Sequence, residues 1–95
     1  MPTIGVLTIE MRLENSHSLK DKRHVVQSLK ERLRRKFNVA VAEIDHQDLW
    51  QRAALAAVTV SSDHGHAALV LQSVEKEAAA MLGPELVNAT LEWLE

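Results

Sequence analysis

The class of fold is decided by TIGVLTIEMRL, residues Thr3–Leu13, and by SLKDKRHVVQSLKERLRRKF, residues Ser18–Phe37. In the first segment apolar residues occupy every second position, which is typical of a β-strand with one buried face. In the second segment they recur every three or four positions, which indicates an amphipathic α-helix. Ser18, with Asp21 three residues later, resembles a capping box and is the expected start of the helix. Asn38 is its expected left-handed end.

Two more strands and a second helix are expected in the middle of the chain. Residues 39–45 and the apolar residues 53–61 predict the second and third strands, and the polar stretch HQDLWQR, residues 46–52, connects them. Asp63 is the expected N-cap of a second helix near residues 66–82, where apolar positions again repeat at helical spacing.

The end of the chain completes the pattern. Gly83 and Pro84 combine a C-cap glycine with a helix breaker, and residues 86–94 alternate as a last strand. The order βαββαβ predicts a single ferredoxin-like domain over residues 1–95. This fold is an α+β sandwich in which two helices cover one face of a four-stranded antiparallel sheet. The first and third strands are expected in the centre of the sheet.

The composition is that of a small globular protein. The chain has 95 residues, 46% hydrophobic and 25% charged, which suits one domain with a modest core. Because there is no cysteine, disulfides, thiolate zinc sites and cysteine nucleophiles are excluded. The N-terminal residues do not have the basic and apolar regions of a signal peptide, and no apolar run is long enough to cross a membrane. We therefore expect a cytoplasmic protein that does not bind membranes.

The second face of the predicted sheet is unusually apolar. Alternation places Ile4 and Val6 on the side away from the helices, with one set of side chains from residues 53–60. An exposed sheet face normally carries polar residues. The simplest account is a homodimer in which a second copy covers this face.

Several functions of ferredoxin-like domains need residues that this chain lacks. A soft-metal chaperone needs paired cysteines, an RRM-type sheet needs aromatic residues on its central strands, and a KH-type clamp needs a GxxG loop. An acylphosphatase-like site needs an arginine in a glycine-rich loop after the first strand, where this chain has ENSHS. We therefore expect a protein that is not an enzyme and needs no cofactor. A small-ligand regulatory module remains an alternative.

A polar cluster surrounds the connection between the second and third strands. Its members are Glu43, Asp45, His46, Asp48 and Trp50, together with Lys22 of the first helix. A carboxylate–histidine site for a metal or for acid–base chemistry is one interpretation. The favoured interpretation is a turn in which Asp and His cap backbone groups, with Trp50 as a packing anchor at the turn or at a dimer interface. Base stacking is the alternative role for Trp50.

The pair His64 and His66 at the start of the second helix is the other candidate for metal binding. Both flank Gly65 in the stretch DHGH. Two histidines alone are a weak metal signal, so we expect an ordinary helix-start loop here.

Positive charge is concentrated on the first helix. Eight of the 11 basic residues lie between Lys20 and Lys36, a segment of net charge +6, whereas the remainder of the chain carries −8. Such asymmetry points toward an anionic partner. At about 100° per residue, four cations fall within an outward arc of roughly 80°. We call this set the helix-one stripe: Lys20, Arg23, Lys30 and Arg34.

The helix dipole separates the cations of this helix into two groups. Arg34, Arg35 and Lys36 lie in the last turn, where positive charge is stabilising. Cations in the first turns oppose the dipole and need a local or functional explanation. Lys22 falls on the core side, so its stem must run along the sheet and its ammonium must reach an acid. Glu43 is the expected partner.

The stretches SLKDKR, FNV and HQDLWQ, together with the βαββαβ order, resemble the YlxP-like family of small bacterial proteins, a domain of unknown function. The resemblance covers essentially the whole chain and implies a ferredoxin-like fold. It implies no catalytic residues. Genes of the family often lie beside those of transcription-elongation, translation-initiation and ribosome-maturation factors, which implies a role linked to the ribosome or to RNA.

Two functions are therefore compared. The first is a binding protein that docks on ribosomal or other structured RNA through the helix-one stripe. The second is a dimeric small-ligand or regulatory module with its site at the sheet interface or around residues 43–50. A protein–protein adaptor that binds an acidic partner through the same stripe is a third possibility.

Overall fold

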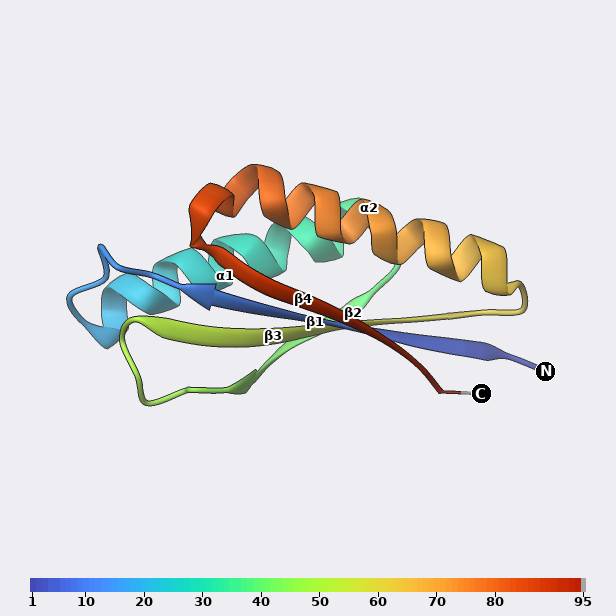
Figure 1. Ribbon diagram of the computed structural model, residues 1–95, viewed down its shortest axis with the longest axis horizontal. Coiled ribbons are helices and arrows are strands. Elements are labelled where there is room, and N and C mark those ends of the chain that lie inside the picture. Colours follow the sequence, from blue (N-terminus) through green and yellow to red (C-terminus); the bar gives the residue numbers. More distant parts are fainter. Residues whose placement is uncertain (95) are drawn as a thin grey trace.

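The computed structural model describes residues 1–94, which form a four-stranded antiparallel sheet and two long helices (Figure 1). The strand order is β2-β3-β1-β4, so the first and third strands are central, as predicted. The architecture is the ferredoxin-like βαββαβ sandwich. Its elements in chain order are β1 (Thr3–Arg12), α1 (Leu19–Lys36), β2 (Ala40–Asp45), β3 (Arg52–Ser61), α2 (His64–Leu82), the 3₁₀ turn η1 (Gly83–Glu85) and β4 (Leu86–Leu94).

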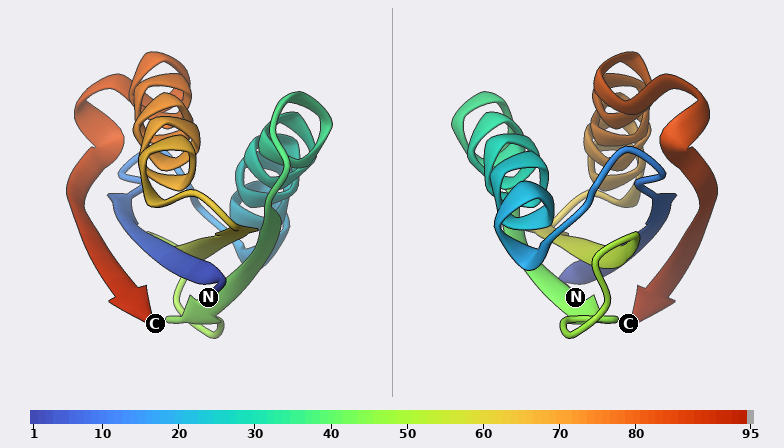
Figure 2. Two further views of the ribbon diagram at one scale, coloured as in Figure 1. Left: turned by 90° about the vertical axis from the view of Figure 1, so that its right-hand side faces the viewer. Right: turned by 90° about the vertical axis from the view of Figure 1, so that its left-hand side faces the viewer.

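Both helices lie on the same side of the sheet and are inclined to one another (Figure 2). The core lies between the helices and the sheet. It contains the alternating side chains of β1, which are buried as the sequence pattern predicted. Its other main contributors are apolar residues of both helices and of β3. The core residues of β1, α1 and α2 include Leu7, Ile9, Met11, Leu29, Leu33, Leu71 and Val74.

A glycine in β1 allows α2 and β4 to approach closely. A Cβ atom placed on Gly5 would lie 2.6 Å from Leu71 Cδ1 and 2.6 Å from Trp93 Cζ3. Real Cβ atoms do not make contacts this short, so any larger residue would displace the helix or the indole ring. Gly5 is therefore required by packing rather than by backbone conformation.

The start of α1 agrees with the prediction and its end does not. The Ser18 hydroxyl accepts from the Asp21 amide at 3.1 Å, as in a capping box, while the Asp21 carboxylate accepts from the amide of His17 at 3.0 Å. At the other end Phe37 is already extended and its amide donates to the Leu33 carbonyl. Asn38 is not left-handed, so the predicted αL end is wrong. The chain instead turns directly into β2.

The second helix begins earlier than predicted. It starts at His64 rather than near residue 66, and the Asp63 carboxylate caps it by accepting from the His66 amide at 2.9 Å. Gly83 ends the helix with a positive φ of 57°, which suits glycine. Met81 is one of the apolar positions at helical spacing from which we expected core residues, but it is 39% exposed and lies outside the core.

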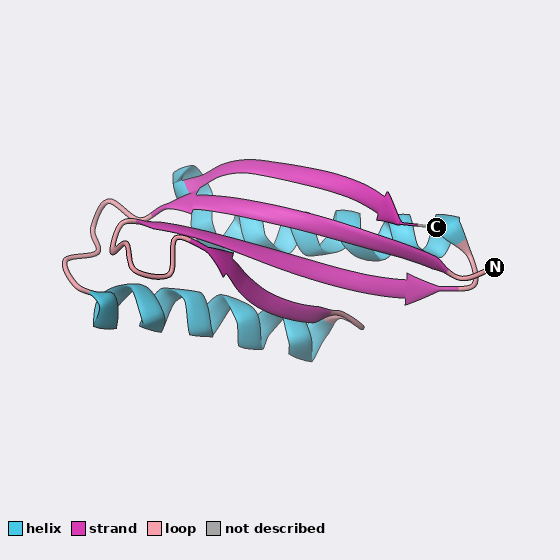
Figure 3. Cartoon of the chain, turned by 90° about the horizontal axis from the view of Figure 1, so that it is seen from below, coloured by secondary structure: helices cyan, strands magenta, loops and turns pink. Residues whose placement is uncertain are grey.

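The helix-free face of the sheet is open to the viewer in Figure 3. The strand registers place Ile4, Val6, Val58 and Val60 on this face, together with alanines of β2 and β3. Val60 is 58% exposed and Leu94, opposite Ile4, is 54% exposed. The apolar composition expected for this face is therefore present in the structure.

Candidate nucleic-acid interface

The helix-one stripe is an exposed row of cations on α1. Lys20, Arg23 and Arg34 are exposed and Lys30 is partly exposed. Within residues 1–94 none of the four lies within 4.0 Å of a carboxylate oxygen. Glu31, which interrupts the stripe, accepts a hydrogen bond from Gln27 at 3.1 Å instead. From Lys20 to Arg34 the stripe extends about 21 Å, at 1.5 Å per residue.

Two other cations of α1 share one carboxylate of the second helix. Arg32 Nε lies 2.6 Å from one oxygen of Glu77, and Lys36 Nζ lies 2.8 Å from the other. The hydrogen bonds from Lys36 and then from Arg32 lower the pKa of the Glu77 carboxyl below its ordinary value. The helix dipole accounts for only part of the favourable position of Lys36, and the ion pair with Glu77 is a second stabilising contact. No local sequence pattern indicates this pair, because its partners lie 41 residues apart in sequence.

Lys22 is buried, as its position on the core side required. Its side chain is 2% exposed and Nζ lies 3.0 Å from Glu43 Oε2, which confirms the predicted partner. This approach does not have hydrogen-bond geometry, and within the described residues Glu43 Oε2 has no other polar partner. Nζ donates its hydrogen bonds to the carbonyl oxygens of His46 and, at 2.8 Å, of Leu49. The ammonium therefore joins α1 to the β2–β3 loop, residues 46–51.

The β2–β3 loop is a compact hydrogen-bonded turn. His46 has a φ of 62°, its amide donates to the Asp45 carboxylate at 2.8 Å, and its carbonyl accepts from the Leu49 amide at 3.1 Å. Asp45 thus caps the turn, as the favoured interpretation predicted. Asp48 is exposed. The polar-cluster residues do not converge on one point, since Lys22 contacts Glu43 and the His46 carbonyl, Asp45 contacts His46, and Asp48 has no ion-pair partner among residues 1–94.

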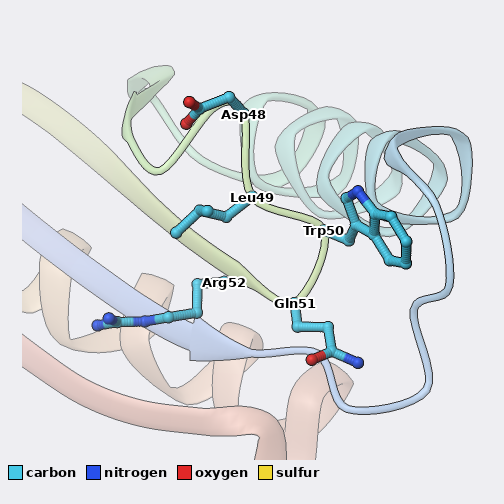
Figure 4. Close-up of a pocket in the computed structure, with 5 residues that line it drawn as sticks. All are labelled: Asp48, Leu49, Trp50, Gln51 and Arg52. Carbon is cyan, nitrogen blue, oxygen red and sulfur yellow. The ribbon is translucent and has the colours of Figure 1, made fainter.

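The loop also forms one wall of a surface hollow of about 400 Å³ (Figure 4). Trp50 is 52% exposed and Leu49 is 44% exposed, so Trp50 does not anchor the packing of the turn within the chain, and its other expected place, at a dimer interface, stays a prediction. The reason is that the buried Lys22 holds the turn from beneath, through backbone carbonyls. The residues that line the hollow are Asp48, Leu49, Trp50, Gln51 and Arg52.

The histidines at the start of α2 have local structural contacts. The His64 ring lies 4.2 Å from the Trp93 ring, centroid to centroid, and the His66 amide is capped by Asp63. Residues 1–94 contain no group of three or more His, Cys, Asp or Glu side chains arranged to hold a metal. No helix in this part of the chain is both long enough and apolar enough to span a membrane.

Comparison with known proteins finds one matching family and solved structures that share the fold. The profile described as "Protein of unknown function (DUF503)" matches residues 4–91. The chain is 38% identical over 71 residues to "Uncharacterized protein YlxP" of Bacillus subtilis (strain 168), covering 75% of this chain and 77% of that protein.

Two de novo designed proteins share the fold at low identity. Foldit4 has a TM-score of 0.65 and 10% identity, with 100% of this chain and 98% of that chain covered. LFR1 1, described as having a ferredoxin fold, has a TM-score of 0.54 and 14% identity, with 99% and 84% covered. These likenesses concern the fold alone.

Proposed function

The chain belongs to the DUF503 family of proteins of unknown function, and from that premise we propose that it is a non-enzymatic binding protein that docks on structured RNA. The helix-one stripe carries this interface. Ribosomal RNA is the first ligand to test, because the family resemblance associates such proteins with ribosome maturation and translation initiation.

The observation that supports this proposal is the division of the α1 cations into paired and free side chains. Lys22, Arg32 and Lys36 have carboxylate partners within the fold, whereas the four stripe residues and Arg35, which lies outside the stripe, have none within residues 1–94. Lys20 and Arg23 also oppose the helix dipole, so an external anion would relieve an unfavourable local field. A straight row of cations about 21 Å long matches a sugar–phosphate backbone better than it matches a compact small anion.

Binding through this row has a defined dependence on salt. Four phosphate contacts give a slope of log affinity against log salt of about −3 to −4. Between about 50 and about 200 mM salt the affinity is then expected to fall roughly 100-fold. Backbone contacts of this kind position the protein and carry little sequence preference. A weak, salt-dependent preference for folded RNA is the expected behaviour.

The test compares two variants with equal changes in net charge. Lys20→Glu with Arg23→Glu reverses half of the stripe, and Arg35→Glu with Lys76→Glu reverses two exposed cations outside it. Affinity for ribosomal RNA, measured by filter binding over a salt series, is expected to fall at least tenfold for the first variant and much less for the second. Equal losses would show that only total charge matters and would contradict the proposal.

Two other outcomes distinguish the alternative functions. Capture of a partner that survives nuclease treatment, and is lost in the stripe variant, would indicate an acidic protein rather than RNA. Thermal stabilisation by a metabolite or a divalent metal, insensitive to salt and to the stripe charges, would indicate a regulatory module.

We also propose that a second copy of the chain covers the helix-free face. Support comes from the apolar row that includes Ile4, Val58 and Val60 across the central strands. Four strands of about nine residues present a footprint of about 600 Å², at ordinary strand spacings. That area is comparable with the roughly 800 Å² per partner of a typical stable interface. The pair would leave both stripes free on the outer helices.

A further inference from the structure

The β2–β3 loop has two features that a simple six-residue connection between strands does not need. It is supported by a fully buried cation, Lys22, and it contains a non-glycine residue with positive φ, His46. Both features are unfavourable by themselves: a buried charge loses its hydration, and left-handed backbone is strained for residues other than glycine. Unfavourable features that persist because their surroundings hold them are typical of functional segments.

The side chains that this loop displays do not contribute to the core. Leu49 and Trp50 are two of the large apolar side chains that remain about half exposed. Figure 4 shows that the Trp50 ring points to the opposite side from Leu49 and Arg52. The loop therefore presents the indole ring alone, on a rigid backbone and away from the sheet.

The neighbours of Trp50 are both fixed to the N-terminal end of α1. The Leu49 carbonyl accepts from Lys22 Nζ at 2.8 Å, and Lys22 lies between Lys20 and Arg23 of the stripe. The Gln51 side chain donates to the carbonyls of Glu14 and Ser16, just before the helix, at 3.4 and 3.3 Å. Trp50 therefore stands beside the N-terminal end of α1, the end at which the helix-one stripe begins.

We infer that Trp50 is the base-stacking platform of the α1 interface, and that the ligand is an RNA stem with an unpaired nucleotide beside it. This inference rests on the proposed function. An exposed indole ring near the helix end where a row of cations begins combines the two elements that bind unpaired nucleotides, an aromatic face for the base and positive charge for the backbone. Asp45 at the end of β2 and Asp48 on the loop repel phosphate, so the backbone would approach from the α1 side.

The experiment compares two RNA probes that differ only in an unpaired segment. One is a blunt duplex and the other is the same duplex with a single-stranded tail. The variant Trp50→Leu is expected to lose about 5- to 150-fold in affinity for the tailed duplex, the range of one base–aromatic stack. It should bind the blunt duplex like the unaltered protein. Trp50→Phe keeps an aromatic face and should retain most of the affinity for the tail.

Fluorescence gives a second measurement. The variant Trp93→Phe leaves Trp50 as the one indole in the chain. Its emission should be quenched by the tailed duplex and changed little by the blunt duplex. If the variant Trp93→Phe does not fold because of its packing against Gly5, the RNA affinities of the Trp50 variants alone test the stacking inference.

The possible failures are distinguishable. If Trp50→Leu binds both probes like the unaltered protein, while the stripe variant loses both, the stacking inference is wrong and the proposed function stands. If the unaltered protein binds neither probe, the proposed function itself fails and the inference with it. If Trp50→Leu changes the oligomeric state, Trp50 belongs to a protein interface, which overturns its role as a base platform.

Discussion

Replacing Lys22 with methionine should destabilise the protein strongly, because the buried ammonium has three partners. The substitution keeps most of the apolar stem and removes only the charge and its donors. It leaves the Glu43 carboxylate, whose side chain is 20% exposed, with no countercharge in contact, and it leaves the carbonyls of His46 and Leu49 without their donor. Removing one partner of a buried pair typically costs about 3–5 kcal/mol.

The loss should fall near the lower end of that range. The β2–β3 loop lies at the surface, so its carbonyls and the partly exposed carboxylate regain some contact with water. We therefore expect about 3 kcal/mol from urea unfolding of Lys22→Met, which corresponds to a fall in Tm of about 12–24 °C for a domain of this size. Hydrogen exchange should show the largest loss of protection in residues 46–51.

The partner variant makes this reasoning testable as a cycle. Glu43→Gln leaves Lys22 with its two carbonyl acceptors, so the expected loss is smaller, about 1–2 kcal/mol. Combining Lys22→Met with Glu43→Gln removes both charges and should recover part of the loss from Lys22→Met alone. A loss below about 1 kcal/mol for Lys22→Met, or a double variant that simply sums the two single losses, would refute the role given to the ion pair.

Three further predictions follow from the same packing. Glu77→Gln should lower Tm near neutral pH, because the folded-state pKa of Glu77 is lowered. The contribution of Glu77 to stability is present above the ordinary glutamate pKa of about 4.3 and disappears as the pH falls through the lower folded-state pKa. The Tm values of the variant and the unaltered protein should therefore converge in acid. Gly5→Ala should destabilise by about 1–3 kcal/mol in urea titrations, whereas Gly65→Ala, whose new methyl group meets ordinary contacts, should be neutral or stabilising by up to about 1 kcal/mol. Val60→Asp on the helix-free face should shift the sedimentation equilibrium toward monomer, and Leu69→Asp, an equally exposed change on α2, should not; a monomer already present in the unaltered protein at all concentrations would rule out the dimer.

The buried lysine could be predicted because one strong rule applied to it. A charged side chain that helical periodicity places on the core side must find a partner, and strand alternation placed Glu43 on the inner face of the neighbouring strand. The two loop carbonyls that complete its surroundings could not be predicted. They depend on the path of the backbone through His46 and Leu49, for which periodicity gives no information.

The errors at helix ends and at the turn have a common origin. Asn38 is a good left-handed residue by type, yet the chain enters β2 in extended conformation because Val41 must reach the core beside β3. Trp50 is large and apolar, which favours burial, but the space beneath the turn is already occupied by the Lys22 side chain. In both cases tertiary packing overrides a residue's own preference.

The order of the elements, the inner face of β1 and the uneven distribution of charge can all be predicted from the amino-acid sequence, because each is expressed in local spacing along the chain. Which of those charges are free depends on how the chain folds. Glu77, 41 residues from Lys36, pairs with two cations of α1, and the fold leaves the stripe without such a partner among residues 1–94. Packing of the same kind holds the neighbours of Trp50 against the N-terminal end of α1, where that row begins. Contacts between residues far apart in sequence depend on how helices and loops pack, and that arrangement is a property of the whole fold.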